Sequence, residues 1–158
     1  TLHGEVSEWL KGEDYGLMVT HANPAGDWLQ GGFDADAGLT GRKLVVDNYG
    51  PRVPIGGGAY SGKDPSKVDR SAAYMARHIA VEELKRKGLE ECWVYLSYAI
   101  GEREPLQATV TDGHNSWDIP SNYPIYPNEI ISYLNLKEPI YYETSQWGAY
   151  GNGFKWDK

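Results

Sequence analysis

The sequence contains a single cysteine, Cys92, and no long apolar run among its 158 residues. One cysteine cannot form a disulfide within the chain, so we expect a protein of a reducing, cytoplasmic compartment. No stretch reaches the roughly 20 apolar residues that a membrane-spanning helix needs, and no signal peptide is recognisable at the start. Cys92 precedes the apolar run 93–100, where we expect a buried small side chain and no nucleophile.

Basic side chains are also few, with 15 lysines and arginines against 22 acidic residues and a net charge of −7. This balance argues against general nucleic-acid binding, which needs a broad basic face. The four histidines have no metal-ligand spacing, and we predict no catalytic role for them. An apolar content of 41% with 23% charged residues is typical of an ordered globular protein.

A glycine-rich stretch with two lysines runs from Gly56 to Asp69 and reads Gly-Gly-Gly-Ala-Tyr-Ser-Gly-Lys-Asp-Pro-Ser-Lys-Val-Asp. Glycines lack a Cβ atom and therefore let the backbone come close to a ligand. The stretch leads into a predicted helix, whose free amide groups and dipole favour negative charge at its start. The groups that we expect to hold a polyanion are Gly57, Gly58, the Ser61 hydroxyl, and the ammonium groups of Lys63 and Lys67.

Asp69 lies one turn into the predicted helix, where a carboxylate can hold a divalent cation against the same anion. The spacing of Gly57, Gly62 and Lys63 matches the Walker pattern only as far as the lysine, because Asp64 occupies the hydroxyl position. Glycine-rich turns also lead into capped helices without any ligand, so a purely structural role for this stretch remains an alternative.

The charge of the chain reverses locally around this stretch. Residues 41–77 hold seven basic side chains and three acidic ones, whereas the whole chain carries −7. A basic segment in an otherwise acidic protein favours a focused anion site.

The pattern of apolar residues and turn formers predicts three strands, a helix, two further strands and a second helix. We expect strands at 16–21, 28–30, 44–46, 92–100 and 106–111, and helices at 64–87 and 127–136. The longer helix has Asp64 and Pro65 at its predicted start and Gly88 at its end. This order predicts an α+β fold with a mainly antiparallel sheet packed with helices.

Several motifs occur together in one order. They are Asn23-Pro24-Ala25-Gly26, Gly38-Leu39-Thr40-Gly41-Arg42-Lys43, the stretch Gly56–Asp69 with Arg70-Ser71-Ala72-Ala73-Tyr74, Ser97-Tyr98-Ala99-Ile100-Gly101, and Pro139-Ile140-Tyr141-Tyr142-Glu143-Thr144. With these motifs the chain resembles S-adenosylmethionine synthetase (methionine adenosyltransferase) along nearly its whole length. Members of that family are typically more than twice as long, and the chain resembles their C-terminal part.

The resemblance implies roles for the basic residues. The family's matching Arg-Lys pair grips the triphosphate of ATP, which assigns that role to Arg42 and Lys43. Lys63 and Lys67 match two lysines that contact the phosphates, and Asp69 matches an acidic ligand of magnesium. Taken from the residues alone, an exposed basic pair such as Arg42 and Lys43 is usually solvated surface.

Three further positions match residues that contact the substrates. Trp28 stands where the family stacks an aromatic ring on adenine, although a core aromatic in a strand is an alternative. Asp36 matches an aspartate near the methionine ammonium and the nucleoside, and its alternative is a turn former. Ile100 matches a residue beside the methionine side chain, and by pattern alone it would be a core residue.

The resemblance also implies a fold, a reaction and cofactors. The family is built of three related α/β units, and residues 34–158 would form the last unit with its triphosphate-binding loop. Residues 1–33 would be part of the preceding unit and a linker. The implied reaction is attack of the methionine sulfur on C5′ of ATP, with Mg²⁺ and K⁺ as cofactors.

The family motifs of the N-terminal part, among them His-Pro-Asp-Lys and Gly-Ala-Gly-Asp-Gln-Gly, do not occur here. We therefore expect a C-terminal part or small subunit that is inactive alone and works with a larger chain as a hetero-oligomer. Two alternatives remain: a non-catalytic nucleotide-binding regulatory subunit, and a structural assembly subunit whose lysines face solvent.

Overall fold

The computed structural model describes residues 29–38 and 41–158. Contacts divide the chain into two units, Thr1–Gly38 and Leu39–Lys158. In the first unit, the amides of Ala35 and Asp36 both donate to the Gly32 carbonyl and form a turn. The strand expected at 16–21 and Trp28 lie outside the described residues, and residues 29–30 do not form the expected strand.

The second unit is built on an open antiparallel sheet of three strands in the order β1-β2-β3. The strands are β1 (Trp93–Ser97), β2 (Gln107–Thr111) and β3 (Ser116–Asp118). Val94 pairs with Val110, and Val110 pairs with Trp117, so these three side chains share one face. That face packs against the core, where Val110 is fully buried. The expected α+β class with an antiparallel sheet is confirmed.

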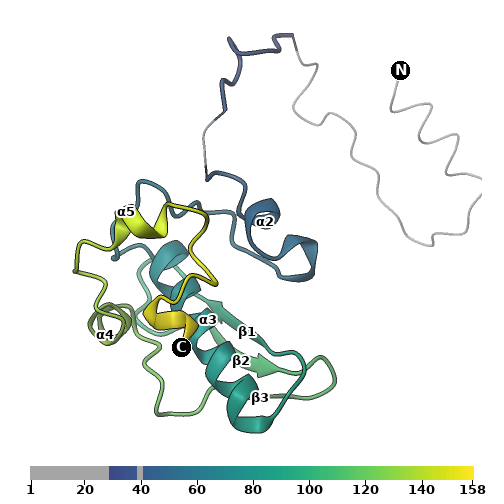
Figure 1. Cartoon of the computed structure of the whole chain (residues 1–158), viewed down its shortest axis with the longest axis vertical. Coiled ribbons are helices and arrows are strands. Elements are labelled where there is room, and N and C mark those ends of the chain that lie inside the picture. Colours follow the sequence, from purple (N-terminus) through teal and green to yellow (C-terminus); the bar gives the residue numbers. More distant parts are fainter. Residues whose placement is uncertain (1–28, 39–40) are drawn as a thin grey trace, which may run out of the picture. The chain divides into compact units, whose positions relative to one another are not determined.

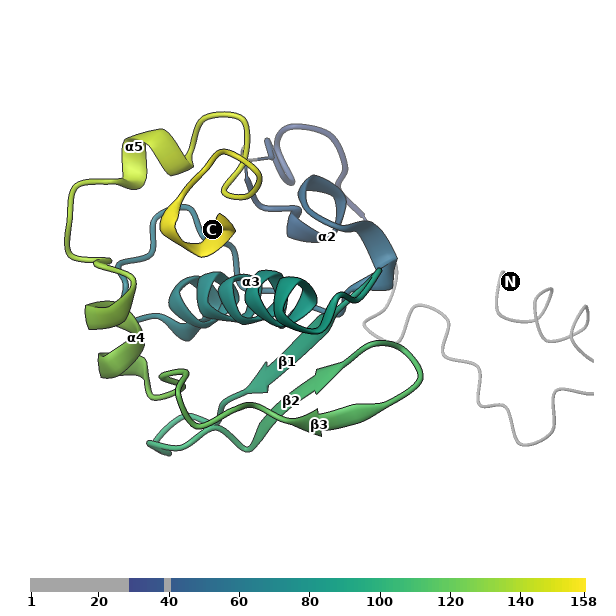
Figure 2. The ribbon, with the colours of Figure 1, turned by 60° about the horizontal axis from the view of Figure 1, so that its bottom comes forward.

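Helix α3 (Val68–Lys87) lies across the core face of the sheet (Figure 2). Its stripe of Ala72, Met75 and Ile79 is buried, as the helical spacing predicts. Gly88 ends the helix in the left-handed conformation at φ 65°, a backbone state that glycine adopts without steric cost. The start differs from the prediction: Asp64 accepts a hydrogen bond from the Ser66 amide and closes a separate turn, so the helix begins four residues later.

The C-terminal segment covers the side of α3 that faces away from the sheet (Figures 1 and 2). It contains α4 (Pro127–Tyr133), α5 (Tyr141–Thr144) and the 3-10 helix η2 (Lys155–Asp157). Trp156 is 1% exposed, stacks on Tyr74 of α3 at 3.9 Å between ring centroids, and donates its indole N–H to the Ala149 carbonyl. The segment after residue 137, which shows no periodicity in the sequence, is therefore held by aromatic packing.

The strand expected at 44–46 is wrong. Leu44–Asp47 form the short helix α2, followed by the 3-10 helix η1 (Gly50–Arg52). The amides of Asp47 and Asn48 donate to the carbonyls of Lys43 and Leu44. These backbone groups are therefore hydrogen-bonded within the segment and need no partner strand. Only Leu44 is buried, while Val46 is 79% exposed, which leaves its β-branched side chain without a sheet to pack on.

The remaining expected elements are shorter than predicted. The strand of 92–100 covers Trp93–Ser97, that of 106–111 covers Gln107–Thr111, and the helix of 127–136 covers Pro127–Tyr133. Strand β3 falls within a segment that the sequence predicts to be a loop. Among the described residues, no helix is both long and apolar enough to cross a membrane.

Candidate functional site

The glycine-rich stretch forms an irregular loop that ends at the first turn of α3. Gly57 and Gly62 adopt φ values of +85° and +77°, which favour glycine at both positions. The Lys63 amide donates to the Tyr60 carbonyl at 3.1 Å and closes a turn at the end of the loop. Lys67 is the residue before α3, and no side chain caps the helix there. The loop thus delivers two lysines to the helix N-terminus.

Lys63 and Asp69 form an ion pair across the start of α3. The Lys63 Nζ lies 3.2 Å from Oδ2 of Asp69, and both side chains are partly exposed. The Asp69 carboxylate also lies over the loop backbone: a Cβ atom on Gly58 would be 2.1 Å from its Cγ. Glycine is therefore required at position 58 for the carboxylate to take this place. The predicted site residues Gly58, Lys63 and Asp69 lie together.

The predicted basic pair, Arg42 and Lys43, is carried by a segment that touches the same loop. A Cβ atom on Gly41 would lie 3.8 Å from the Ser61 Cβ, an ordinary van der Waals contact. Arg42, Lys43, Ser61 and Lys67 are all exposed. Their functional groups are accessible to a ligand that approaches the loop from solvent.

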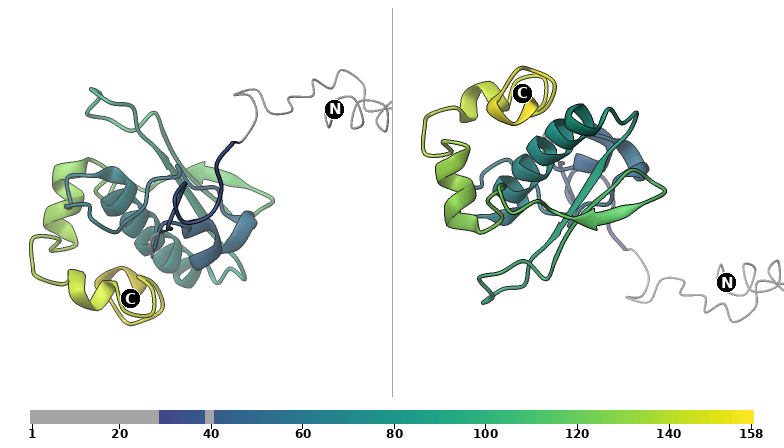
Figure 3. Two further views of the ribbon diagram at one scale, coloured as in Figure 1. Left: turned by 90° about the horizontal axis from the view of Figure 1, so that it is seen from above. Right: turned by 90° about the horizontal axis from the view of Figure 1, so that it is seen from below.

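Two other predicted residues belong to segments other than the glycine-rich loop and α3. Asp36, in the first unit, accepts a hydrogen bond from the Gly38 amide at 2.8 Å, the geometry expected of a turn former. Ile100 lies in the turn between β1 and β2, which extends clear of the helices (Figure 3). Its side chain is fully exposed, so the alternative of a core residue is wrong. Trp28 lies outside the described residues, and the roles of all three remain predictions.

Contacts that the sequence did not predict join the loop to the C-terminal segment. The hydroxyl groups of Tyr60 and Tyr150 are 2.5 Å apart. Burial raises the pKa of Tyr60 to about 12 and raises that of Tyr150 well above its usual value, so both hydroxyl groups stay protonated. The Arg70 guanidinium is a second link, because it donates both to the Lys63 carbonyl of the loop and to the Thr144 hydroxyl of the C-terminal segment. The aromatic character of the tail was visible in the sequence, but its partners were not.

A groove of about 800 Å³ opens beside the loop. Gly56, Gly58 and Asp69 line it together with residues of α2, η1, the first half of α3, and β1. Alanines of α3 and apolar side chains of β1 make much of its wall, while Arg52 and Glu91 form an ion pair at 2.8 Å on its lining. The groove could receive a partly apolar group next to the lysines.

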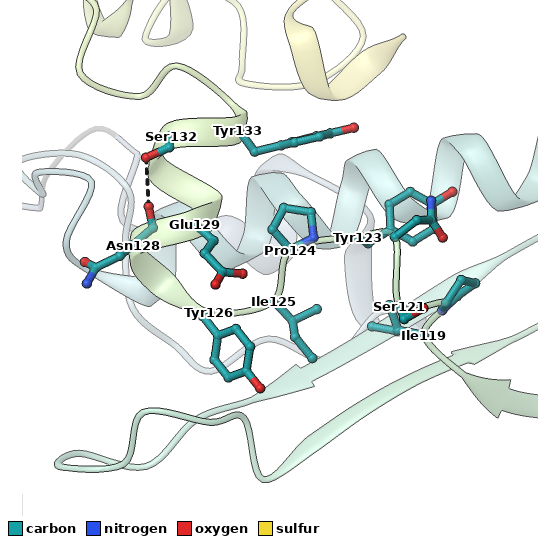
Figure 4. Close-up of a pocket in the computed structure, with 12 residues that line it drawn as sticks. Ile119, Ser121, Tyr123, Pro124, Ile125, Tyr126, Asn128, Glu129, Ser132 and Tyr133 are labelled. Carbon is teal, nitrogen blue, oxygen red and sulfur yellow. Dashed lines mark hydrogen bonds between the residues drawn. The ribbon is translucent and has the colours of Figure 1, made fainter.

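A second, wider hollow lies between the 119–126 segment and α4 (Figure 4). Its volume is about 1000 Å³, and among the described residues its lining contains one carboxylate, Glu129, and no lysine or arginine. The Ser132 hydroxyl on its rim donates to the Asn128 carbonyl. None of the predicted site residues of the second unit lines this hollow, and the charge of its described lining does not suit an anion.

Cys92 is partly buried against the core, and burial raises the pKa of its thiol to about 11. The thiol is therefore protonated at neutral pH, which fits the expected structural role. Among residues 29–38 and 41–158, no three histidine, cysteine or acidic side chains gather in a metal cluster. Asp69 is a single carboxylate, and Mg²⁺ is commonly held by one or two carboxylates together with phosphate oxygens. The residues present fit that mode of binding.

The fold and the loop define an α+β unit with a lysine-bearing, glycine-rich loop at a helix N-terminus. The family model described as "S-adenosylmethionine synthetase, C-terminal domain" matches residues 30–158. The chain therefore belongs to the S-adenosylmethionine synthetase family and corresponds to its C-terminal portion.

Relatives in bacteria carry the same family name. The chain is 42% identical to the S-adenosylmethionine synthase of Ruegeria pomeroyi, over 95% of this chain and 41% of that protein. It is 43% identical to that of Bradyrhizobium diazoefficiens, over 89% of this chain and 39% of the relative. It is 46% identical to that of Borreliella burgdorferi, over 86% and 37% respectively. The chain thus spans about two-fifths of the length of the curated relatives that it matches.

Proposed function

We propose that this chain is the C-terminal part or small subunit of a methionine adenosyltransferase. The enzyme makes S-adenosylmethionine from ATP and methionine. The triphosphate leaves whole, and water then hydrolyses it to pyrophosphate and phosphate. The observation that carries the proposal is the grouping of Lys63, Asp69 and Gly58 at the start of α3, in a chain of this family. A lysine, a carboxylate and an open glycine backbone at a helix N-terminus are what a metal-bound polyphosphate needs.

The basic side chains neutralise the triphosphate. Arg42 and Lys43 reach the phosphates from the segment beside Ser61, and Lys63 and Lys67 reach them from the loop. A planar guanidinium next to ammonium groups suits phosphate oxygens. The backbone at Gly57 and Gly58 and the Ser61 hydroxyl line the approach.

Asp69 would hold Mg²⁺, which when bound supplies positive charge against the leaving triphosphate. In the described structure the Asp69 carboxylate contacts the Lys63 ammonium, so Lys63 and the metal would share this carboxylate. We propose K⁺ as a second cofactor from the family resemblance and assign no residue to it.

The residues outside the loop bind the other parts of the substrates. In this proposal Trp28 stacks on adenine, Asp36 lies near the methionine ammonium and the nucleoside, and Ile100 contacts the methionine side chain. The full exposure of Ile100 supports the last role, because an exposed apolar side chain is available to cover a ligand.

The chain's residues act by alignment and charge, and no proton has to be removed from the nucleophile. The methionine sulfur is a thioether and carries no proton, so no general base is needed. Attack on C5′ breaks the bond to the triphosphate oxygen, and negative charge grows on the leaving group. Four basic side chains fixed around that group lower the barrier by electrostatic stabilisation.

The remaining part of the enzyme comes from a larger partner chain in this proposal. The chain matches only about two-fifths of each relative, which supports the need for that remaining part. We expect a hetero-oligomer in the cytoplasm, joined by the large apolar interface of an obligate complex.

Native mass spectrometry of the protein from its own source, with a turnover assay on the same sample, tests this proposal. Co-purification with a larger chain and formation of S-adenosylmethionine with pyrophosphate are the expected results. A lone 158-residue species that binds ATP without turnover would replace the proposal by the regulatory-subunit interpretation. Nucleotide binding by the complex that Lys63→Ala weakens would argue against a structural assembly subunit. Binding that is absent, or that Lys63→Ala leaves unchanged, would favour it.

A further inference from the structure

Arg70, in the first turn of α3, is one of the few buried cations of the described structure, with only 7% of its surface exposed. Its guanidinium donates three hydrogen bonds: from Nε to the Tyr74 hydroxyl at 3.0 Å, from Nη1 to the Lys63 carbonyl at 2.8 Å, and from Nη2 to the Thr144 hydroxyl at 3.3 Å. Its face lies over the Tyr141 ring at 4.2 Å. The group is fixed by three separate segments of the chain.

Arg70 forms no salt bridge with any residue that the structure describes. Within residues 29–38 and 41–158, no carboxylate lies within ion-pair distance of its guanidinium. Burial of a charged group without a counter-ion is costly, so its hydrogen bonds and aromatic contact must hold it in place. Among those bonds, only the bond to Lys63 reaches the glycine-rich loop.

Lys63 is held at three points by its neighbours. Its amide donates to the Tyr60 carbonyl, its carbonyl accepts from Arg70, and its ammonium lies against Asp69. The first bond belongs to the loop itself, while the other two come from the first turn of α3. Arg70 and Asp69, adjacent in sequence, thus fix the backbone and the side chain of one lysine.

We propose that Arg70 is a positioning residue that aims the Lys63 ammonium at the phosphates by holding the Lys63 carbonyl. It acts through Lys63 and touches no substrate. The inference rests on the proposed function, since it concerns the phosphate-binding role of Lys63. Thr144 and Tyr141 hold the guanidinium in turn, so α5 sets the place of a loop that lies about 80 residues earlier in the sequence.

A double-mutant cycle between Arg70→Lys and Lys63→Ala in the assembled enzyme tests this inference. Lysine keeps the charge but lacks the planar fork, so it cannot make all three bonds. We expect Arg70→Lys to lower kcat/KM by about tenfold in the normal background and by less than about twofold when Lys63 is already alanine. Arg86→Lys is the matched control, because it breaks a bidentate pair with buried Glu83 at the far end of α3. It should lower thermal stability and leave kcat/KM unchanged.

Additive losses in the cycle would overturn the positioning role, because a merely structural residue lowers activity whether or not Lys63 is present. Lys63→Ala without any loss of activity would instead refute the phosphate role of Lys63, and with it the proposed function. If Arg70→Lys does not fold, Thr144→Val supplies the same cycle with a milder change. It keeps the guanidinium and removes the acceptor of the Nη2 bond, together with the bond that the Thr144 hydroxyl donates to the Tyr141 carbonyl. We expect Thr144→Val to lower kcat/KM in the normal background and to have little effect when Lys63 is already alanine. Additive losses in this second cycle would also reject the inference.

Discussion

The Cγ atom of Asp69 lies 2.1 Å from the point where a Cβ atom on Gly58 would be. The carboxylate therefore fills the space that any side chain at position 58 would occupy. The Asp69 side chain of the helix packs directly against the loop backbone at this position. Gly56, two residues earlier, is different: its Cβ atom would lie 3.8 Å from Asp69 Oδ1, an ordinary contact.

This contrast predicts a position-specific effect of alanine in the loop. Gly58→Ala must displace the Asp69 carboxylate or the loop, and we expect Mg²⁺-dependent ATP binding by the assembled enzyme to weaken by at least about tenfold. Gly56→Ala is the control and should bind within about twofold of the unchanged enzyme. Isothermal titration with ATP and Mg²⁺ measures both. Equal losses in the two variants would show that the loop responds to any added methyl group and that the contact with Asp69 is not special.

We predict that removal of an exposed basic side chain of the site lowers turnover and leaves the fold intact. Arg42→Ala and Lys67→Ala remove exposed side chains, so thermal unfolding should change little. Turnover of the assembled enzyme should fall by about a hundredfold or more in each, because in the proposed function each side chain supplies positive charge to the leaving triphosphate. Lys137→Ala, an exposed lysine after α4, is the control with normal turnover. Wild-type rates in either site variant would remove that residue from the site.

The stack of Trp156 on Tyr74 predicts that the tail contributes strongly to stability. Trp156→Ala leaves a large cavity and should lower the free energy of unfolding by about 3–5 kcal/mol. Trp147→Ala is a matched control, because Trp147 is 96% exposed and should change stability by less than about 0.5 kcal/mol. Urea denaturation of the 158-residue chain measures both. A small effect at position 156 would mean that the tail is dispensable for the core.

From the turn between β2 and β3 we predict that Asp112 makes a pH-dependent contribution to the free energy of unfolding. The amides of Asn115 and His114 donate to the Asp112 carboxylate and lower its pKa to about 2. A folded-state pKa below the unfolded value of about 3.9 stabilises the fold above that value, and the stabilisation is lost as the pH falls towards 2. Asp112→Asn keeps an acceptor but cannot titrate.

We therefore expect the stability difference between the normal chain and Asp112→Asn to shrink as the pH is lowered from about 5 to about 3. Denaturant unfolding at several pH values in this range checks it. A difference that stays constant with pH would show that the turn does not depend on the charge of Asp112.

The sequence predicted those elements that local chemistry decides. Gly88 indicated the end of α3, and the apolar spacing indicated its buried face. The class of fold followed from the order of elements. Leu44–Asp47 was missed because β-branched residues favour a strand only where a neighbouring strand exists, and here the backbone bonds to itself.

The candidate site was predictable only where its residues are close together in the sequence. Gly58, Lys63 and Asp69 lie within a dozen positions, so their grouping follows from one loop and one helical turn. From the sequence, Arg70 is one of the basic residues and part of a family motif, and no role is predicted for it. Its partner Thr144 is 74 positions away, and no local pattern indicates the contact. The assignments of Trp28, Asp36 and Ile100 depend on the family resemblance and stay predictions.

The links between the loop and the tail have a consequence for the order of folding. The β1–β2 hairpin and α3 form from neighbouring residues, whereas the Tyr60–Tyr150 and Arg77–Asp157 contacts join residues 90 and 80 positions apart. Contacts of such separation form late, since a long loop must first close. A partly folded chain would therefore contain the hairpin and the helix before the glycine-rich loop is in place. A ligand of that loop binds only chains that have completed the last step, and by mass action it draws the folding equilibrium towards them.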